Sequence, residues 1–286
     1  MKTVLGIDIG GTKMRAGLVN EQGKVGQISE IPTEAHKGGA YVVSRILMLI
    51  NGYGSQFSAI GIGTAGQVGF DGTILSATST FPNWAGIELQ KEISQQTQLP
   101  VRVINDAHAM ALGELHFGEG RGVRHFICLT LGTGVGGAIM CDGKLYLGAD
   151  GVAGGFGHMV IHKSGRSCPC GEKGCLEAYV SGTALAGRYF ERTGKSRSSH
   201  EIMGGVQQGE PEAVQLFHEF LDDLACGLKS LSNIFNPEKI ILAGGMVHSL
   251  QPYFPEWRET AALPVPVALS SQGDQAMIRG AASLLL

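Results

Sequence analysis

Two segments of the chain have the same order of elements, and this duplication constrains the fold more than any other feature. In the first segment, Ile7-Asp8-Ile9-Gly10 ends an apolar strand, a second strand follows, and Gly23-Lys24 closes a hairpin. In the second, Leu129-Thr130-Leu131-Gly132 is again followed by a strand and then by Gly143-Lys144. A repeat at this distance predicts two similar α/β lobes, each offering a glycine turn to a shared cleft, rather than a short-period solenoid.

The length of 286 residues suits about two domains of ~150 residues. A glycine-rich stretch at 118–122 separates the two copies and is predicted to be a hinge. We therefore expect a small lobe over residues 1–118, joined by the C-terminal helix at about 272–286, and a larger lobe over 119–271. Apolar spacing predicts strands at 4–9, 14–19, 24–31, 59–63, 101–104, 125–131, 135–141, 239–243 and 265–269, and helices at 41–50, 86–97, 107–117, 176–193, 212–235 and 275–286.

Composition excludes several classes of protein. Glycine accounts for 44 residues, about twice the usual share, but there is no Gly-X-Y period and only 10 prolines, so collagen and low-complexity disorder are excluded. A net charge of −3 gives no chain-wide basic surface for nucleic acid. Since no targeting or transmembrane segment is found, we expect a cytoplasmic protein without membrane contacts, whose six cysteines form no disulfide framework.

Each glycine turn follows a strand and has the composition of a polyphosphate site. Glycines let backbone N–H groups approach phosphate oxygens, and threonine hydroxyls add donors. Asp8 ends its strand just before the first turn, where a carboxylate can hold hydrated Mg²⁺. The alternative is that both are only tight hairpin turns, since neither has the spacing of a Walker A or Rossmann motif. The candidate residues are Asp8, Gly10, Gly11, Thr12, Lys13, Gly132, Thr133 and Gly134.

A polar pair, Asn105-Asp106, lies at a strand-to-helix junction. Two interpretations of Asp106 remain open and are compatible. It can cap the N-terminus of the following helix, or it can act as the base that accepts a proton from an attacking hydroxyl in phosphoryl transfer.

The most specific cluster is His158 followed by Cys168, Cys170 and Cys175. One imidazole and three thiolates form a closed tetrahedral Zn²⁺ site, which is structural rather than catalytic. Because the loop is rich in glycine and charge, a metal could organise it. The alternatives are three unrelated cysteines with a core histidine, or His162 as the fourth ligand.

The sequence resembles the ROK family of bacterial sugar kinases and repressors over essentially the whole chain. The stretches that carry the resemblance occur in the family's order: Asp8 to Lys13, Leu131 to Gly137, Gly157-His158, Cys168 to Glu177 and Gly244-Gly245. The resemblance implies the two-lobed actin-like, Hsp70-like sugar kinase fold, with duplicated RNase H-like lobes and ATP between them. It also implies a homodimer.

The same resemblance implies roles for individual residues. Asp106 would be the catalytic base, and His158 would bind zinc through one ring nitrogen and a sugar hydroxyl through the other. Asn105, Glu177, Gly66 and Gln67 would lie at the sugar, and Gly244 and Gly245 would line the adenosine pocket.

One position departs from the family pattern. Kinases of this family usually carry a sugar-contacting glutamate three residues before the histidine, where this chain has Gly155. Water could fill the space while glucose-like sugars still bind. Alternatively, the space accommodates another sugar, such as one with an N-acetyl group at C2, or the change weakens catalysis.

We therefore predict an ATP- and Mg²⁺-dependent kinase that phosphorylates a primary hydroxyl, O6, of a hexose or an N-acetylhexosamine: glucose, fructose, N-acetylglucosamine or N-acetylmannosamine. The alternative within the family is a sugar-binding transcriptional regulator or weakly active sensor. Only seven residues precede Asp8, which we expect to leave no room for a DNA-binding segment. An actin-like filament or chaperone ATPase is a third class that the fold alone would allow.

Overall fold

The computed structural model describes residues 2–273 and 275–286. Residues 1 and 274, which the predicted lobe ranges include, lie outside the described residues. The chain divides into two compact units. The first comprises residues 1–122, 138–153 and 271–286, and the second comprises residues 123–137 and 154–270. The boundaries of the predicted lobes remain a prediction.

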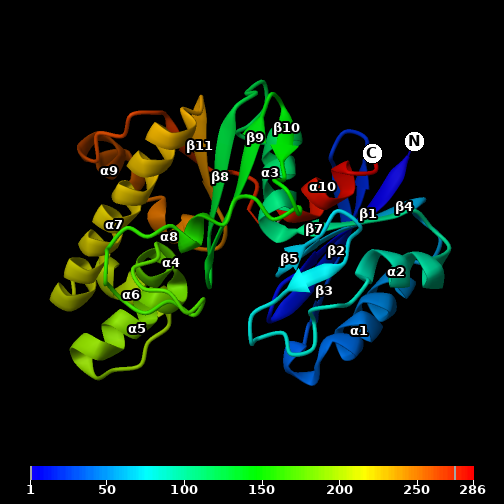
Figure 1. The fold of residues 1–286 in the computed structure, drawn as a ribbon, viewed down its shortest axis with the longest axis horizontal. Coiled ribbons are helices and arrows are strands. Elements are labelled where there is room, and N and C mark those ends of the chain that lie inside the picture. Colours follow the sequence, from blue (N-terminus) through cyan, green and yellow to red (C-terminus); the bar gives the residue numbers. More distant parts are fainter. Residues whose placement is uncertain (1, 274) are drawn as a thin grey trace. The chain divides into compact units, whose positions relative to one another are not determined.

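The first unit is built on a five-stranded sheet with the order β3-β2-β1-β4-β7 (Figure 1). Strands β1, β2 and β3 form an antiparallel meander, whereas β4 and β7 run parallel to β1. The strands are β1 (Thr3–Ile9), β2 (Lys13–Asn20), β3 (Val25–Pro32), β4 (Ala59–Thr64) and β7 (Val101–Asn105). A small sheet pairs β5 (Gln67–Val68) with β6 (Ile74–Ser76). The helices are η1 (Ala35–Lys37), α1 (Gly39–Asn51), α2 (Leu89–Thr97), α3 (Asp106–Phe117) and α10 (Gln275–Ser283).

The alternation of side chains along β1 divides the core of this unit between the two faces of the sheet. Leu5, Ile7 and Ile9 face a large apolar cluster that includes α1, whereas Val4 packs with Ile278 of α10. On the α10 face the backbones approach closely. A side chain at Gly6 would overlap the main-chain carbonyl of Ile278, so glycine is needed there.

The second sheet repeats the topology of the first, with the order β10-β9-β8-β11-β12. Here β9 and β10 form the antiparallel hairpin, and β8, β11 and β12 run parallel. The duplication predicted from the two glycine turns is therefore confirmed. The strands are β8 (Phe126–Leu131), β9 (Val135–Cys141), β10 (Lys144–Tyr146), β11 (Lys239–Ala243) and β12 (Val267–Leu269).

The second unit is rich in helices (Figure 1). They are η2 (Phe156–His158), α4 (Glu177–Val180), α5 (Gly182–Thr193), α6 (Ser199–Gln207), α7 (Pro211–Phe235), α8 (Val247–Leu250) and α9 (Phe254–Thr260). The helix predicted at 176–193 is wrong as one element: Ser181 adopts an extended conformation, and its side chain caps α5 through Ala184 N. Among the described residues, no helix is long and apolar enough to cross a membrane.

Candidate active site

In the first unit, the junction of β7 and α3 holds the polar pair Asn105-Asp106. The structure assigns the helix cap to Asn105, whose Oδ1 accepts from Ala107 N at 2.9 Å and from His108 N at 3.4 Å. Its Nδ2 donates to Asp106 Oδ1 at 2.8 Å and to Gly66 O at 2.9 Å. Asn105 therefore fixes the position of the carboxylate next to it.

One carboxylate oxygen of Asp106 accepts hydrogen bonds from neighbouring residues, and the other is available to accept a proton. Oδ1 accepts from Asn105 Nδ2 and, at 2.8 Å, from Ala107 N. Oδ2 has no hydrogen-bond partner within the described ranges. Burial raises the pKa of this carboxyl from 3.8 to about 6, although both hydrogen bonds oppose the rise. A carboxylate with this pKa is ionised at neutral pH and is a better proton acceptor than an exposed aspartate.

Two further residues implied at the sugar follow β4: Gly66 lies in the turn, and Gln67 is the first residue of β5. Gly66 has a left-handed backbone (φ 102°), and its carbonyl accepts from Asn105, so the structure brings it to the Asp106 junction. Gln67 is exposed and accepts from Ser76 Oγ at 2.8 Å. The contact with Ser76 holds the Gln67 amide against β6.

The first glycine turn connects β1 to β2. Gly10 N donates to Lys13 O at 3.0 Å, and Thr33 Oγ1 donates to Gly10 O at 2.7 Å. Gly11 and Thr12 are exposed at its tip, and the Lys13 ammonium forms an ion pair with Glu30 at 3.1 Å. This turn is an open loop with an exposed tip.

Asp8 lies on β1 just before that turn and is only 7% exposed. Carboxylate oxygen is the ligand type that Mg²⁺ prefers, and the position next to a glycine turn is compatible with a hydrated ion beside a phosphate. The chemistry of this one carboxylate is therefore compatible with magnesium.

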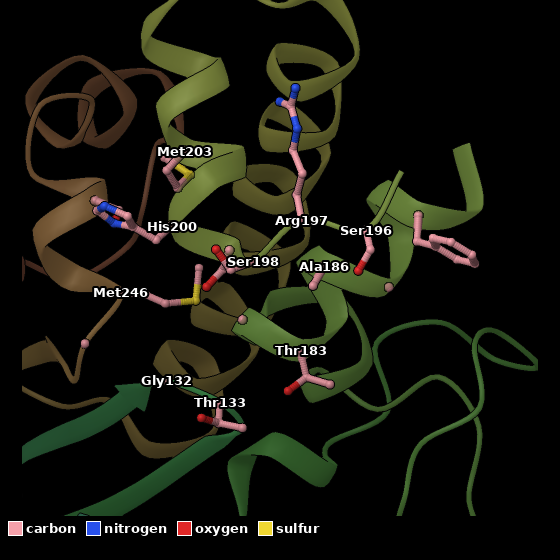
Figure 2. Close-up of a pocket in the computed structure, with 16 residues that line it drawn as sticks. Gly132, Thr133, Thr183, Ala186, Ser196, Arg197, Ser198, His200, Met203 and Met246 are labelled. Atoms are coloured by element: carbon pink, nitrogen blue, oxygen red, sulfur yellow. The ribbon is translucent and has the colours of Figure 1, made fainter. Parts of the chain in front are cut away.

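The second glycine turn, between β8 and β9, borders a cavity of about 720 Å³ in the second unit (Figure 2). Gly132 O accepts from Gly182 N at 2.8 Å, and Thr133 O accepts from Thr183 N at 3.3 Å, so the start of α5 fixes the turn. The predicted residues Gly132, Thr133 and Gly245 line the cavity. Gly134 and Gly244 are not among its lining residues. Gly244 has φ 94° and lies against the Leu131 backbone.

Most of the cavity wall was not predicted from the sequence. It comes from α5, from the loop and helix that follow, and from Met246 (Figure 2). The sequence holds one signal for part of this wall: Ser198 and Glu201 have the spacing of a capping box, which they form at the start of α6. The unpredicted residues are Gly182, Thr183, Ala186, Gly187, Phe190, Ser196, Arg197, Ser198, Ser199, His200, Met203, Met246 and Ser249.

Glu177 connects the metal loop to the second glycine turn. It is the first residue of α4, directly after Leu176, and its Oε2 accepts from Val135 N at 2.8 Å. A side chain at Gly134 would overlap this carboxylate, so the approach requires glycine. Glu177 thus contacts the second glycine turn and lies two positions after Cys175 in the chain.

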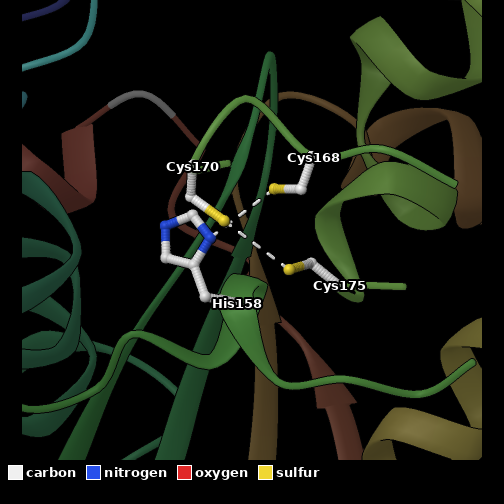
Figure 3. Close-up of side chains that lie close together, drawn as sticks. All are labelled: His158, Cys168, Cys170 and Cys175. Carbon is white, nitrogen blue, oxygen red and sulfur yellow. Dashed lines mark hydrogen bonds between the residues drawn. The ribbon is translucent and has the colours of Figure 1, made fainter. Parts of the chain in front are cut away.

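The predicted metal ligands converge in the second unit (Figure 3). The ligand atoms of His158, Cys168, Cys170 and Cys175 all lie within 4.8 Å of one another. Cys168 Sγ is 3.8 Å from His158 Nδ1, and Cys170 Sγ is 3.7 Å from Cys175 Sγ. Tetrahedral Zn²⁺ with Zn–S bonds of ~2.3 Å requires S···S separations of about 3.8 Å, so the ligand types and these separations are compatible with zinc.

His158 presents Nδ1 to the thiols, which leaves Nε2 without a hydrogen-bond partner among the residues that the structure describes. The competing ligand His162 is wrong: its Nε2 lies 2.7 Å from Asp223 Oδ1 of α7. Asp223 in turn accepts from the buried Arg188 of α5 at 3.3 Å. His162 therefore anchors the loop to α7 and lies outside the group of candidate metal ligands.

Gly155, the departure from the family pattern, precedes η2 with φ −67° and ψ 49°. A Cβ built on it would have no heavy atom within 4 Å. The position is therefore open, and neither backbone conformation nor packing requires glycine there.

A profile of the ROK family matches residues 4–286. The chain belongs to the ROK family. It is 33% identical to a glucokinase from Thermotoga maritima, over 99% of this chain and 96% of that protein. It is 30% identical to an N-acetyl-D-glucosamine kinase from Pectobacterium atrosepticum, over 98% of each.

Among solved structures, a ROK family glucokinase from Streptomyces griseus in complex with glucose and AMPPNP is 33% identical. It aligns with a TM-score of 0.87 over 99% of this chain and 98% of that one. The predicted fold class, the duplicated actin-like α/β fold of the ROK sugar kinases, is thereby confirmed.

Proposed function

We propose that this chain, a sugar kinase by its family, transfers the γ-phosphoryl group of ATP to the O6 hydroxyl of a hexose or an N-acetylhexosamine. The observation that carries the proposal is Asp106, whose Oδ1 is fixed by Asn105 and whose Oδ2 is available. The names of its relatives, glucokinase and N-acetyl-D-glucosamine kinase, support the substrate class.

In the proposed reaction, Asp106 Oδ2 accepts the proton of the attacking hydroxyl. The raised pKa of this carboxyl keeps it a competent base near neutral pH. Phosphoryl transfer depends mainly on positioning and on stabilisation of charge. Asn105 supplies the positioning, because it holds both the carboxylate and Gly66.

ATP binding is proposed for the cavity bordered by Gly132, Thr133 and Gly245. The adenosine part would occupy the cavity, and the turn amides would face the phosphates. Asp8 would hold Mg²⁺, which neutralises phosphate charge, and the His158 cluster would hold a structural Zn²⁺. Because the metal would bind Nδ1 of His158, it would fix the imidazole ring so that Nε2 points at a sugar hydroxyl.

Gly155 is proposed to set the sugar preference. The open position accommodates either water or a substituent at C2 of the sugar. Replacing Gly155 with Glu adds a strong hydrogen-bond acceptor without a backbone penalty, since its φ is −67°. We therefore expect Gly155→Glu to raise kcat/KM for glucose relative to N-acetylhexosamines. If the ratio of kcat/KM for glucose to that for N-acetylhexosamines stays unchanged, Gly155 does not set the sugar preference.

The test of the function is ADP release with ATP and Mg²⁺ against glucose, fructose, mannose, allose, N-acetylglucosamine and N-acetylmannosamine. We expect one strongly preferred sugar, and a kcat on it about 10³-fold lower in Asp106→Asn. Sugar binding without turnover in the wild type would overturn the kinase proposal and favour the sugar-binding regulator or sensor. Sedimentation of the same preparation tests the proposed homodimer.

A further inference from the structure

A second cavity, of about 490 Å³, lies in the first unit. This volume falls within the ~300–1,000 Å³ range of small-molecule sites. The walls come from the β2–β3 hairpin, the end of α3 with the turn after it, and α10. None of the residues discussed above for sugar, nucleotide or metal lines it, apart from the hairpin glycine. The lining residues are Glu21, Gln22, Gly23, Lys24, His116, Phe117, Arg121 and Arg279.

Positive charge gathers around this cavity. Lys24, Arg121 and Arg279 line it, and Glu21 is the sole carboxylate among its described lining residues. None of the three cations forms an ion pair with any residue in the described ranges. The whole chain carries a net charge of −3, so a concentration of unpaired cations around one cavity favours an anionic ligand.

Arg279 is held in place by hydrogen bonds that leave donors available. Its Nε donates to Gly23 O at 2.9 Å, and its Nη1 donates to Gln272 Oε1 at 2.9 Å. Gln272 is anchored to α3, because its Nε2 donates to Gly113 O at 2.8 Å. Arg279 Nη2 has no hydrogen-bond partner among the described residues. The guanidinium is therefore oriented in advance, which lowers the entropy cost of binding an acceptor.

The hairpin wall is also fixed. Asn20 Oδ1 accepts from Gln22 N at 3.1 Å and from Lys24 N at 2.9 Å. Gly23 has φ 74°, and a side chain there would overlap the ring of Phe117. The hairpin thus packs directly on the end of α3, and the position of the Lys24 backbone is set before any ligand binds.

We propose that this cavity binds a small phosphate-bearing anion, whose phosphate is held by Lys24, Arg121 and Arg279. The three cations come from three separate segments: Lys24 from the β2–β3 turn, Arg121 from the turn after α3, and Arg279 from α10. A phosphate group presents oxygens in several directions and can accept from all three, whereas a carboxylate has two oxygens in one plane. The proposal does not depend on the kinase activity, since no residue of that mechanism takes part.

Isothermal titration with glucose 6-phosphate, inorganic phosphate and malate tests this proposal, and the amide NMR signals of Gly23 and Lys24 locate the binding. We expect both phosphate compounds to shift these signals. The double variant Lys24→Ala/Arg121→Ala should bind the phosphate compound that shifts them about tenfold or more weakly at this location. The control Arg102→Ala/Lys144→Ala, which removes two exposed cations that do not line the cavity, should bind as the wild type does.

Tighter binding of glucose 6-phosphate than of inorganic phosphate would support a phosphate ester as the ligand, and equal binding would support free phosphate. Malate shifting the hairpin signals as strongly as phosphate would overturn the proposal. Unchanged signals with every probe, or an unchanged affinity in the Lys24→Ala/Arg121→Ala variant, would also overturn it. Absence of sugar turnover would leave these results unaffected, so the two proposals can fail separately.

Discussion

The two copies of the duplicated sheet place their glycine turns in different surroundings. The turn at Gly10 is an open loop with exposed tip residues, anchored by Thr33. The turn at Gly132 accepts hydrogen bonds from the start of α5, contacts Glu177 through Val135, and borders a large cavity. The sheet topology is the same. The difference therefore arises from the segments inserted after each sheet's hairpin, which give one copy the candidate base and the other the cavity and the metal loop.

We expect the largest effect from a change at Asp106, which tests whether the base lies in one copy and the nucleotide cavity in the other. Asp106→Asn keeps the Oδ1 acceptor but removes the base, so we expect kcat to fall about 10³-fold while nucleotide affinity stays within about twofold. Turnover assays and nucleotide titration measure the two quantities. Asp71→Asn, at an exposed carboxylate of the same unit, serves as the control. A comparable loss of nucleotide affinity in Asp106→Asn would contradict the division between the two copies.

Removing the proposed zinc ion should have the next largest effect. Cys175 is buried, and burial raises the pKa of its thiol to about 12, so without a cation it remains protonated at neutral pH. Cys175→Ser should lose bound zinc, measured by elemental analysis, and should lower kcat/KM for the sugar about 100-fold.

The control for this change is Cys226→Ser, an exposed cysteine outside the cluster. It should keep the wild-type zinc content and kinetics. Retention of stoichiometric zinc by Cys175→Ser would show that the cluster is not the zinc site.

The pH dependence of turnover gives a third comparison. Asp106, the proposed base, must be ionised to accept a proton, and burial raises its pKa to about 6, so we expect activity to be lost as the pH falls through 6. Between pH 7 and pH 5 we expect kcat/KM to fall about tenfold. A pH profile of kcat/KM, measured with a chromogenic coupled assay, should show this fall. If activity instead falls only near pH 4, Asp106 is not the titrating base.

The smallest effect should come from partial filling of the cavity in the second unit. Ala186→Phe places a ring in that cavity, so we expect KM for ATP to rise about fivefold with little change in sugar KM. Gly204→Phe is a matched control on α6, because position 204 has open space and does not line the cavity. Equal ATP KM values for the two variants would argue against nucleotide in this cavity.

The features predicted best from the sequence are those encoded within one stretch of chain. The strands and the two glycine turns have local apolar spacing and turn residues, and the cysteines lie within eight positions, so their convergence needs only a short loop. His158 was separated from them by ten residues but lies in the same loop, and its grouping with them is found in the structure.

The cavity wall was harder to predict, because it assembles residues from segments far apart in the chain. Met246 and Thr133 border the same space but are separated by more than a hundred positions. No periodicity relates them: the parallel pairing of β8 with β11 brings them together, and Met246 N donates to Leu131 O at 3.0 Å. The break at Ser181 was missed for a different reason: the apolar spacing continues through it, and only the capping preference of serine marks the boundary.

The hydrogen bond between Glu177 and Val135 has a thermodynamic consequence. If Glu177 also contacts the sugar, as the family resemblance implies, a single carboxylate lies between the sugar and the glycine turn proposed to face the phosphates. Linkage then requires reciprocity: the factor by which bound sugar changes the affinity for nucleotide equals the factor by which bound nucleotide changes the affinity for sugar. The order in which the two substrates arrive would leave the stability of the ternary complex unchanged, and a neutral substitute at position 177 should bring that shared factor towards one.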